Sequence, residues 1–398
     1  MSATDPAVLV VDDNEDNRYT LTRRLTREGY SNLTTATNGR EALDLLQAKA
    51  FDLVLLDIMM PDMNGYEVLE RMKADAELRN IPVIMISALS EIDSVIRCIE
   101  LGAEDYLPKP FNPTLLRARV GASLEKKRLR DTVRASLARL EHEMDAARKL
   151  QLGMLPLIFP ACTPEQPVEI YALMEPAREV GGDLYDFFFL DGDHLFFMIG
   201  DVSGKGLPGS LFMAISKALY KSTALRRHGQ VAVMMREADA EISRDNAEGL
   251  FVTVLAGILD ARTGALEYCS AGHEPPFLLP RAGRSLSRLT EGGGPPLCAV
   301  DGFDYTAGAC QLAPGDTLCL ITDGITEAAR AAGELYGRPR LEALLGGLGA
   351  AATAADIGEA IRRDVAAFTG DAEASDDMAV LILRFTGPNP LPSGERAG

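Results

Sequence analysis

The sequence predicts three consecutive parts: a doubly wound α/β domain over residues 7–124, a helical coiled-coil linker over 125–154, and an α+β domain over 155–386. Short apolar runs separated by helix-length amphipathic segments are typical of buried parallel strands, and they predict the first part. A heptad pattern without Gly or Pro predicts the second part. Paired runs of alternating polarity around a tight turn predict antiparallel strands in the third.

Composition sets the broad class of the protein and excludes several functions. The 398 residues are 47% hydrophobic and 25% charged, as in soluble globular proteins, and about 150 residues per domain gives two or three domains. A net charge of −18 argues against a nucleic-acid-binding face. No apolar run approaches the roughly 20 residues of a membrane span, and residues 1–6 lack the basic start of a signal peptide. Six cysteines without Cys-x-x-Cys spacing predict reduced core thiols, so we expect a cytoplasmic protein.

Four apolar runs are the predicted strands of the first part: Val8–Val11, Leu53–Leu56, Val83–Ile86 and Tyr106–Leu107. Such runs belong to a five-stranded parallel sheet that helices cover on both faces. In the strand order 2-1-3-4-5, the first and third strands are neighbours, and ligands bind outside their carboxyl ends.

Acidic residues lie at those carboxyl ends. Asp12 and Asp13 follow the first strand, and Asp57 follows the third. Three crowded carboxylates repel one another unless a hard cation neutralises them, and oxygen ligands suit Mg²⁺. Ser87 ends the fourth strand and Lys109 follows the fifth, so a hydroxyl and an ammonium group are expected near Asp57. These donors can stabilise a phosphoryl group carried by that carboxylate.

The linker carries mostly apolar residues, with one small and one polar residue among them, at alternating steps of four and three: Val133, Leu137, Leu140, Met144, Ala147, Gln151 and Met154. No Gly or Pro interrupts the chain between Ser123 and Leu152. About three heptads favour a homodimer through a parallel coiled coil that transmits a signal, and a simple spacer is the alternative.

A hairpin opens the third part. Residues 184–190 and 194–200 alternate in polarity around a three-residue loop, which pairs Leu190 with His194. The same register places Asp183 opposite Asp201. The other expected elements are helices over 207–226, 229–246, 338–347 and 354–369, and strands near 252–260, 265–271, 275–280, 317–322 and 378–385. Residues 387–398 have no periodic pattern and are predicted to be disordered.

The acids of this third part suggest a metal centre. Like charges directly opposite each other destabilise a hairpin, so a cation between Asp183 and Asp201 explains their pairing better than two unrelated loop acids do. Asp323 ends another apolar strand, and Asp376 begins the last one. Four such acids can hold two divalent ions about 3.5–4 Å apart, which activate water and clamp a phosphoryl displacement.

The first part resembles response-regulator receiver domains. The matching motifs are Val-Val-Asp-Asp at 10–13, Leu-Asp-Ile-Met-Met-Pro-Asp-Met-Asn-Gly at 56–65, Ser-Ala at 87–88 and Asp-Tyr-Leu-Pro-Lys-Pro at 105–110. The resemblance implies that a sensor histidine kinase or a phosphotransfer protein donates phosphate to Asp57. It also implies Mg²⁺ ligation by Asp13, by Asp12 mainly through water, and by the carbonyl of Met59.

The same resemblance implies a switch pair, Ser87 and Tyr106, and a cis peptide bond between Lys109 and Pro110. Lys109 would contact the phosphoryl group.

Residues 147–385 resemble the PPM family of metal-dependent serine/threonine phosphatases, in the bacterial branch of stage II sporulation and stress-response phosphatases. The motifs are Gly-Gly-Asp-Leu-Tyr-Asp at 181–186, Gly-Asp-Val-Ser-Gly-Lys-Gly at 200–206, Thr-Asp-Gly-Ile-Thr-Glu-Ala at 322–328 and Asp-Asp-Met at 376–378. The resemblance implies an antiparallel β-sandwich flanked by helices, which binds two Mn²⁺ or Mg²⁺ ions. The substrate it implies is phosphoserine or phosphothreonine on a protein, expected to be an anti-sigma-factor antagonist.

Residue by residue, the resemblance implies that Asp201 bridges the two ions and that the Val202 carbonyl adds a ligand. Asp323 and Asp376 would complete one ion site and Asp183 the other, so these four aspartates form the expected catalytic set.

Two assignments stay open from the sequence alone. Arg178 lies five residues before Asp183, where eukaryotic relatives carry a phosphate-binding arginine that this branch often lacks. His273 is more plausible as a structural residue than as a catalytic one. We therefore expect a two-component response regulator whose phosphatase is controlled through Asp57, and the alternative is a non-catalytic scaffold that binds a partner.

Overall fold

The computed structural model describes residues 5–87, 92–227, 229–244, 246–281, 285–349 and 351–387. The chain divides into two compact units, Met1–Glu141 and His142–Gly398. The tail that the sequence predicts to be disordered lies outside the described residues from position 388 onward. None of the described helices is long and apolar enough to cross a membrane.

The first unit contains the predicted parallel sheet, in the order β2-β1-β3-β4-β5. Its strands are β1 (Val8–Val11), β2 (Leu33–Ala36), β3 (Leu53–Asp57), β4 (Val83–Ser87) and β5 (Asp105–Pro108). Strands β1, β3 and β4 are buried along their whole length, as their apolar runs predict. The sequence did not indicate β2, because this edge strand is half-exposed and reads Leu-Thr-Thr-Ala.

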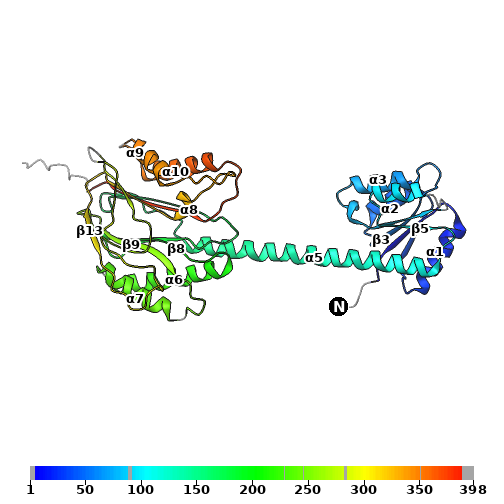
Figure 1. The fold of residues 1–398 in the computed structure, drawn as a ribbon, viewed down its shortest axis with the longest axis horizontal. Coiled ribbons are helices and arrows are strands. Elements are labelled where there is room, and N and C mark those ends of the chain that lie inside the picture. The colour runs from blue at the N-terminus through cyan, green and yellow to red at the C-terminus, as the bar shows by residue number, and fades with distance from the viewer. Residues whose placement is uncertain are drawn as a thin grey trace, which may run out of the picture. The chain divides into compact units, whose positions relative to one another are not determined.

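Helices cover both faces of this sheet (Figure 1). They are α1 (Glu15–Arg27), α2 (Gly39–Ala48), α3 (Gly65–Ala74), α4 (Ile92–Glu100) and the start of α5 (Pro113–Met154), with a 3₁₀ turn at Leu78–Asn80. The side chains of Asn14, Asn38 and Asn64 accept hydrogen bonds from the first-turn amides of α1, α2 and α3. Asparagine caps of this kind satisfy otherwise unpaired N–H groups, and they fix where each helix begins.

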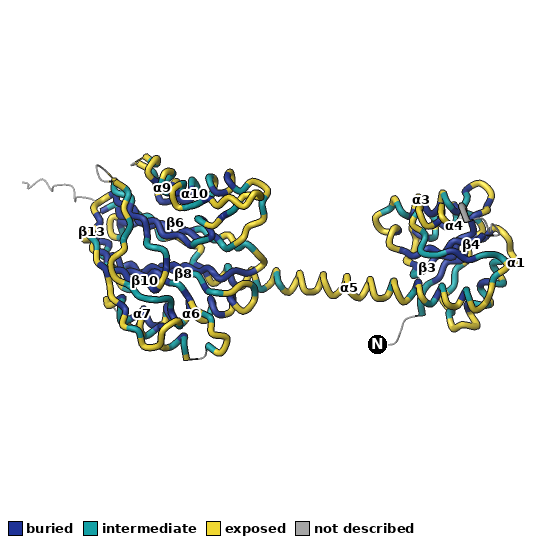
Figure 2. Tube along the Cα trace, in the orientation of Figure 1, coloured by how far each residue is buried: buried dark blue, intermediate teal, exposed yellow. Residues whose placement is uncertain are grey.

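Helix α5 is continuous over 42 residues and contains the predicted helical linker, residues 125–154. It begins in the first unit and ends in the second. Residues 128–143 are exposed on every side of the helix (Figure 2). The apolar residues Val133, Leu137 and Leu140 are 55–58% exposed.

The second unit is an antiparallel β-sandwich flanked by helices, as the resemblance implies (Figure 1). One sheet has the order β13-β10-β9-β8-β7 and the other β12-β11-β14-β15-β6. Apolar side chains from the two inner faces, such as Phe197 and Leu381, form one core cluster. The strands are β6 (Val168–Glu175), β7 (Leu184–Phe189), β8 (His194–Val202), β9 (Val252–Asp260), β10 (Ala265–Ala271), β11 (Phe277–Leu279), β12 (Ser287–Arg288), β13 (Gly308–Gln311), β14 (Thr317–Ile321) and β15 (Met378–Phe385).

Two pairs of helices cover the outer faces of the sandwich. Helices α6 (Leu207–Arg226) and α7 (Val231–Ser243) pack on the first sheet. The second sheet is covered by α9 (Arg338–Gly347) and α10 (Ala354–Thr369), and the short α8 (Asp323–Thr326) follows β14.

A buried ion pair attaches α6 to β7. Asp186 is fully buried, and its carboxylate lies 2.6 Å from Lys217 Nζ and 3.2 Å from Lys221 Nζ. Removing one partner of a buried pair leaves an uncompensated charge, so this contact ties the helix to the strand that begins one residue after Asp183.

One expectation about the core is wrong in part. All six cysteines are free, but only Cys98, Cys269 and Cys319 are buried, and Cys162 is exposed. Cys162 lies between α5 and β6 in a segment without regular structure, which no apolar pattern could have revealed.

Candidate active site and phosphoacceptor site

The carboxyl ends of β1 and β3 bring the three predicted acids of the first unit together. One carboxylate oxygen from each of Asp12, Asp13 and Asp57 lies within 4.8 Å of the others. Lys109 Nζ lies 2.8 Å from Asp12 Oδ2 and 2.9 Å from Asp57 Oδ2. Oxygen ligands in a compact acidic group are what Mg²⁺ requires, so the donor set fits the expected cation.

The titration behaviour of the phosphoacceptor candidate follows from its surroundings. Burial raises the pKa of Asp57, and the charges of Asp12 and Asp13 raise it further, whereas the hydrogen bond from Lys109 opposes this rise. Burial lowers the pKa of Lys109, but its hydrogen bonds with Asp12 and Asp57 outweigh that effect and the pKa is raised overall. Lys109 therefore stays charged next to Asp57.

The other predicted residues of this site lie around Asp57. Ser87 ends β4 and is fully buried, and its carbonyl oxygen accepts hydrogen bonds from the Lys109 amide at 2.8 Å and the Tyr106 hydroxyl at 3.4 Å. Tyr106 is 8% exposed and so points into the domain. Met59 is 63% exposed, so its side chain points towards solvent and only its backbone could contribute a ligand beside the acids. The peptide bond before Pro110 is cis, as the resemblance implies.

In the second unit, the hairpin register predicted from the turn is confirmed. Leu184 pairs with Gly200 across β7 and β8, and the Leu190 amide donates to the His194 carbonyl at 2.8 Å. The next position outward places Asp183 beside Asp201. This pairing puts two carboxylates at one end of an otherwise apolar hairpin.

Burial and mutual repulsion perturb these acids strongly. Burial raises the pKa of Asp183 well above its usual value, and the Asp201 charge adds to the effect. Burial, with the charges of Asp323 and Asp376, raises the pKa of Asp201 to about 7. Burial and the Glu327 charge also raise the pKa of Asp323. Carboxylates held in such a cluster need a cation to ionise together.

A second pair of strands supplies the remaining acids. Asp323 is the first residue of α8, two residues after the end of β14, and Asp376 lies two residues before β15. The two strands are antiparallel neighbours, so their connected ends meet at the site. The Thr322 hydroxyl donates to Asp183 Oδ2 at 2.6 Å and thereby joins this sheet to the hairpin of the other sheet.

Close backbone approach shapes the turn that precedes Asp183. A Cβ atom at Gly182 would lie 2.9 Å from the carbonyl oxygen of Val202, and one at Gly181 would clash with the Asp377 carboxylate. The Asp377 carboxylate accepts hydrogen bonds from the amides of Ala177 at 2.8 Å and Gly182 at 2.6 Å. The Asp377 carboxylate is thus hydrogen-bonded to the backbone of this turn.

An open pocket of about 590 Å³ faces the acids. Asp201, Asp376, Arg178 and Lys205 are among its lining residues. Lys205 Nζ lies 2.9 Å from Asp376 Oδ2 and donates to the Ser375 carbonyl at 2.9 Å. The pocket therefore combines carboxylates for cations with two basic side chains for an anion.

Lys205 and Thr322 lie within the motifs at 200–206 and 322–328, but no role was predicted for either residue. The sequence does show that Lys205 stands between two glycines, and in the structure both have positive φ, Gly204 (102°) and Gly206 (75°), in the loop after Asp201. Only left-handed backbone of this kind turns the loop so tightly, and glycine adopts it without strain.

Four carboxylates and the Val202 carbonyl make a hard oxygen donor set suited to Mn²⁺ or Mg²⁺. Among the described residues, only the acids of the first unit approach each other within 4.8 Å as a group of three.

His273 is buried and has hydrogen-bond partners at both ring nitrogens, which agrees with the expected structural role. His273 is 7% exposed, its Nδ1 lies 2.9 Å from Thr253 Oγ1, and its Nε2 lies 3.0 Å from the Ile321 carbonyl oxygen. Burial lowers the pKa of His273 from 6.5 to about 4, so the ring is neutral at pH 7.

Replacing His273 with Gln should change the pH dependence of stability. Because the pKa is depressed in the folded state, the contribution of His273 to stability is fully present above pH 6.5 and is lost as the pH falls towards 4. The difference in unfolding free energy between wild type and His273→Gln should shrink by up to about 1.4 kcal/mol per pH unit in this window. Urea unfolding between pH 5 and pH 7.5 in chelator measures it, and a pH-independent difference would contradict the assignment.

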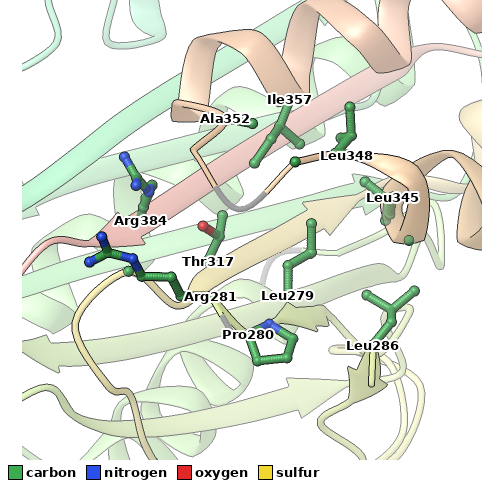
Figure 3. A pocket seen from close by; sticks show the side chains of 13 residues that line it. Leu279, Pro280, Arg281, Leu286, Thr317, Leu345, Leu348, Ala352, Ile357 and Arg384 are labelled. Atoms are coloured by element: carbon green, nitrogen blue, oxygen red, sulfur yellow. The ribbon is translucent and has the colours of Figure 1, made fainter. Parts of the chain in front are cut away.

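Another pocket, of about 530 Å³, lies at the opposite end of β14 (Figure 3). Arg281 and Arg384 lie on one side of it, and Leu286 and Leu345 lie on the other. Arg384 is already paired with Glu169 at 3.1 Å. Thr317 in this pocket is six residues from Asp323 along an extended chain, about 20 Å, so the pocket is separate from the acidic site.

Comparison with known families identifies both units. Residues 8–121 match the family model of the response regulator receiver domain, and residues 191–386 match that of stage II sporulation protein E (SpoIIE). The chain therefore combines a response regulator receiver domain with a domain that matches the SpoIIE family model. Asp201, Asp323 and Asp376 lie inside the SpoIIE match, whereas Asp183 precedes it and is tied to the site by the hairpin register.

Individual relatives of this receiver–SpoIIE protein share parts of it. Protein IcfG of Synechocystis sp. is 29% identical over 268 residues, which are 61% of this chain and 41% of IcfG. The probable transcriptional regulator ycf27 of Cyanidium caldarium is 40% identical over 124 residues, which are 31% of this chain and 48% of that protein. The chain therefore spans less than half the length of these two relatives.

A solved structure supports the fold of the SpoIIE-type domain. The SiaA-PP2C domain of Pseudomonas aeruginosa superposes with a TM-score of 0.54 at 22% identity and covers 63% of this chain and 99% of that domain.

Proposed function

We propose that this response regulator hydrolyses phosphoserine or phosphothreonine on a partner protein, under the control of phosphorylation at Asp57. The observation that carries the proposal is the acidic cluster at the pocket of the SpoIIE-type domain. Two neighbouring carboxylates there, those of Asp183 and Asp201, have strongly raised pKa values, and basic side chains stand at the pocket rim.

In this proposal Asp201 would contribute to the sites of two Mn²⁺ or Mg²⁺ ions, Asp323 and Asp376 would complete one site, and Asp183 would complete the other. The Val202 carbonyl adds a ligand. When bound, such ions supply an activated water and polarise the phosphoryl oxygens. Thr322 holds Asp183 in place through its 2.6 Å hydrogen bond.

Lys205 and Arg178 are the proposed phosphate-binding groups. Both line the pocket, and Arg178 is exposed and able to reach a substrate. The ammonium group of Lys205, next to Asp376, is placed to orient a phosphoryl oxygen by charge-assisted hydrogen bonding.

In the receiver domain, Asp57 is the proposed phosphoacceptor, with Mg²⁺ held by Asp13, by Asp12 mainly through water, and by the Met59 carbonyl. Lys109 would neutralise the phosphoryl group, and Ser87 with Tyr106 would form the switch that reads it. The donor is proposed to be a sensor histidine kinase or a phosphotransfer protein. The substrate of the phosphatase is proposed to be a phosphorylated anti-sigma-factor antagonist.

Hydrolysis of an aryl phosphate in Mn²⁺ tests the proposed activity directly. Turnover that chelator abolishes supports the enzyme, whereas binding of a phosphoprotein without any turnover would favour the alternative, a non-catalytic scaffold.

The exposed seam on α5 supports a homodimer in the same proposal. Val133, Leu137 and Leu140 lie on one stripe of the helix and are more than half exposed. Isolated apolar residues on a surface are ordinary, but a heptad stripe matches the seam of a two-stranded coiled coil.

Replacing Leu137 and Leu140 with Lys should therefore weaken the dimer and uncouple hydrolysis from phosphorylation. Burial of one leucine contributes about 1.5–3 kcal/mol, so losing two per chain should raise the dissociation constant at least about 100-fold. Light scattering with and without acetyl phosphate measures the dimer, and aryl phosphate hydrolysis measures the coupling.

The matched control carries Lys at Ala135 and Ala138, which are exposed residues off the seam. It adds the same charge and should dimerise normally. A wild-type monomer in both phosphorylation states would contradict the dimer, and a full phosphodonor response in the Leu137/Leu140 variant would contradict the coupling.

A further inference from the structure

A single side chain joins helix α5 to the turn that carries Asp183. Gln151 Nε2 donates to the carbonyl oxygen of Gly181 at 2.5 Å, and the Gly181 amide donates to Gln151 Oε1 at 3.0 Å. One side-chain amide therefore satisfies both polar groups of one backbone residue. Gln151 is 6% exposed although it lies in the last turn of a long, largely exposed helix.

The opposite side of this turn is rigidly packed. Asp377 accepts the Gly182 amide at 2.6 Å, and neither glycine has room for a side chain, because Asp377 and the Val202 carbonyl fill the space. The turn is thus held between Gln151 on one side and Asp377 with Val202 on the other. The residue that follows is Asp183, which is held by Thr322.

Gln151 also belongs to the heptad seam, in which Val133, Leu137 and Leu140 are exposed. The seam residue nearest the active site is therefore turned inward onto its own domain. Any rotation or axial shift of α5 moves Gln151 as well. Because both polar groups of its side chain are bonded to Gly181, such a movement must either move the turn or break these hydrogen bonds. Coupling between sites needs an element with two discrete arrangements, and these paired hydrogen bonds, made or broken, provide one.

We propose that Gln151 is a positioning residue through which α5 sets the Gly181–Asp183 turn, and with it the affinity of the metal site. The inference rests on the proposed function and deepens it by naming the contact that transmits the signal. With the bonds formed, Asp183 is held towards Asp201. With the bonds broken, the turn loosens and the metal site weakens.

Gln151→Met in the full-length chain tests this proposal, because methionine matches the length of glutamine but makes neither hydrogen bond. Calorimetric titration with Mn²⁺ should show a dissociation constant raised roughly tenfold, the range seen when groups that orient metal ligands are removed. Hydrogen–deuterium exchange should show loss of protection in peptides covering residues 177–186. Hydrolysis should also lose its response to acetyl phosphate.

Gln311→Met is the matched control. Gln311 Nε2 donates to the carbonyl oxygens of Thr263 at 2.6 Å and Leu312 at 3.3 Å, on the edge strand β13. This variant also loses two hydrogen bonds to backbone, but it should keep wild-type Mn²⁺ affinity and phosphodonor response. A merely structural role for Gln151 would lower the melting temperature of both variants and leave Mn²⁺ affinity unchanged in both.

Gln151→Glu keeps the proposal testable if the methionine variant unfolds. Glutamate can still accept the Gly181 amide but cannot donate to its carbonyl, so Mn²⁺ affinity should lie between those of wild type and Gln151→Met. Wild-type Mn²⁺ affinity and exchange in the folded Gln151 variants would overturn the inference. If the wild-type chain hydrolyses nothing, the proposed function fails, whereas the titration and exchange results still decide the role of Gln151.

Discussion

Replacing Asp201 with Asn is expected to lower metal-dependent hydrolysis by at least about 1,000-fold, because the bridging carboxylate would hold both ions of a two-metal site. Asp201 stands next to Asp183 across the hairpin, and the charges of Asp323 and Asp376 act on it directly. No other carboxylate in the described cluster has this central position. Steady-state hydrolysis of an aryl phosphate in Mn²⁺ is the measurement.

The fold should survive this change. The pKa of Asp201 is raised to about 7, so its contribution to stability is present at low pH and is lost as the pH rises from about 4 to 7. Asn removes a charge that the metal-free fold disfavours, and the metal-free variant should therefore be at least as stable as wild type at pH 8. Thermal unfolding in chelator measures that stability.

Asp304→Asn is the matched control for Asp201→Asn. The Asp304 side chain is 87% exposed and pairs only with Arg236 among the described residues, at 3.1 Å. Its loss should leave turnover within about twofold of wild type, as expected for a weak surface ion pair. Near-normal hydrolysis by a folded Asp201→Asn protein would overturn the two-metal assignment.

The sequence predicted best those parts of the fold in which all residues have the same surroundings. The runs Val8–Val11 and Val83–Ile86 are apolar throughout because both faces of a parallel sheet are covered, and the structure places them in its centre. The hairpin register followed from the loop length, and its continuation beyond Leu184 and Gly200 opposes Asp183 to Asp201; a slip of one residue would turn the buried side chains to the other face.

Edge strands were harder to predict for a physical reason. Strand β2 is half-exposed, and β12 is only two residues long, so neither presents an apolar run. Their positions are fixed by partners that lie far away in sequence, and such pairing leaves no local pattern.

The predicted acids lie at the strand ends named from the sequence, and their catalytic roles stay predictions, whereas the hydrogen bonds that Gln151 and Thr322 make beside them were not predicted. In the sequence, Gln151 is simply a polar residue within a heptad pattern, and Thr322 is the last residue of a predicted strand. Their roles depend on contacts across 30 and 139 residues of sequence. Spacing along the chain cannot reveal contacts of that range, whereas a cluster of like charges at strand ends is visible without them.

Replacing Asp57 with Asn should abolish labelling of the receiver domain by acetyl phosphate, because this carboxylate is the proposed nucleophile and no second one shares its position. Asp57 is 3% exposed at the end of β3, and Lys109 Nζ lies 2.9 Å from it, ready to neutralise the phosphoryl group. Asp12 is instead a proposed Mg²⁺ ligand, and its Oδ1 accepts hydrogen bonds from the Asn14 amide and the Asn17 side chain. Labelling of wild type should require Mg²⁺, and mass spectrometry of the intact chain measures it.

The control for this last prediction is Asp62→Asn, a change at an exposed aspartate in the loop that follows the same strand. Asp62 has a φ of 64°, a left-handed conformation that asparagine tolerates well, so the variant should fold and be labelled like wild type. Because the proposed signal begins at Asp57, Asp57→Asn should also hold hydrolysis at its basal rate whatever the phosphodonor concentration. Equal labelling of the Asp57→Asn and wild-type chains would remove Asp57 as the phosphoacceptor, and a phosphodonor response without labelling would place the control of the phosphatase elsewhere in the chain.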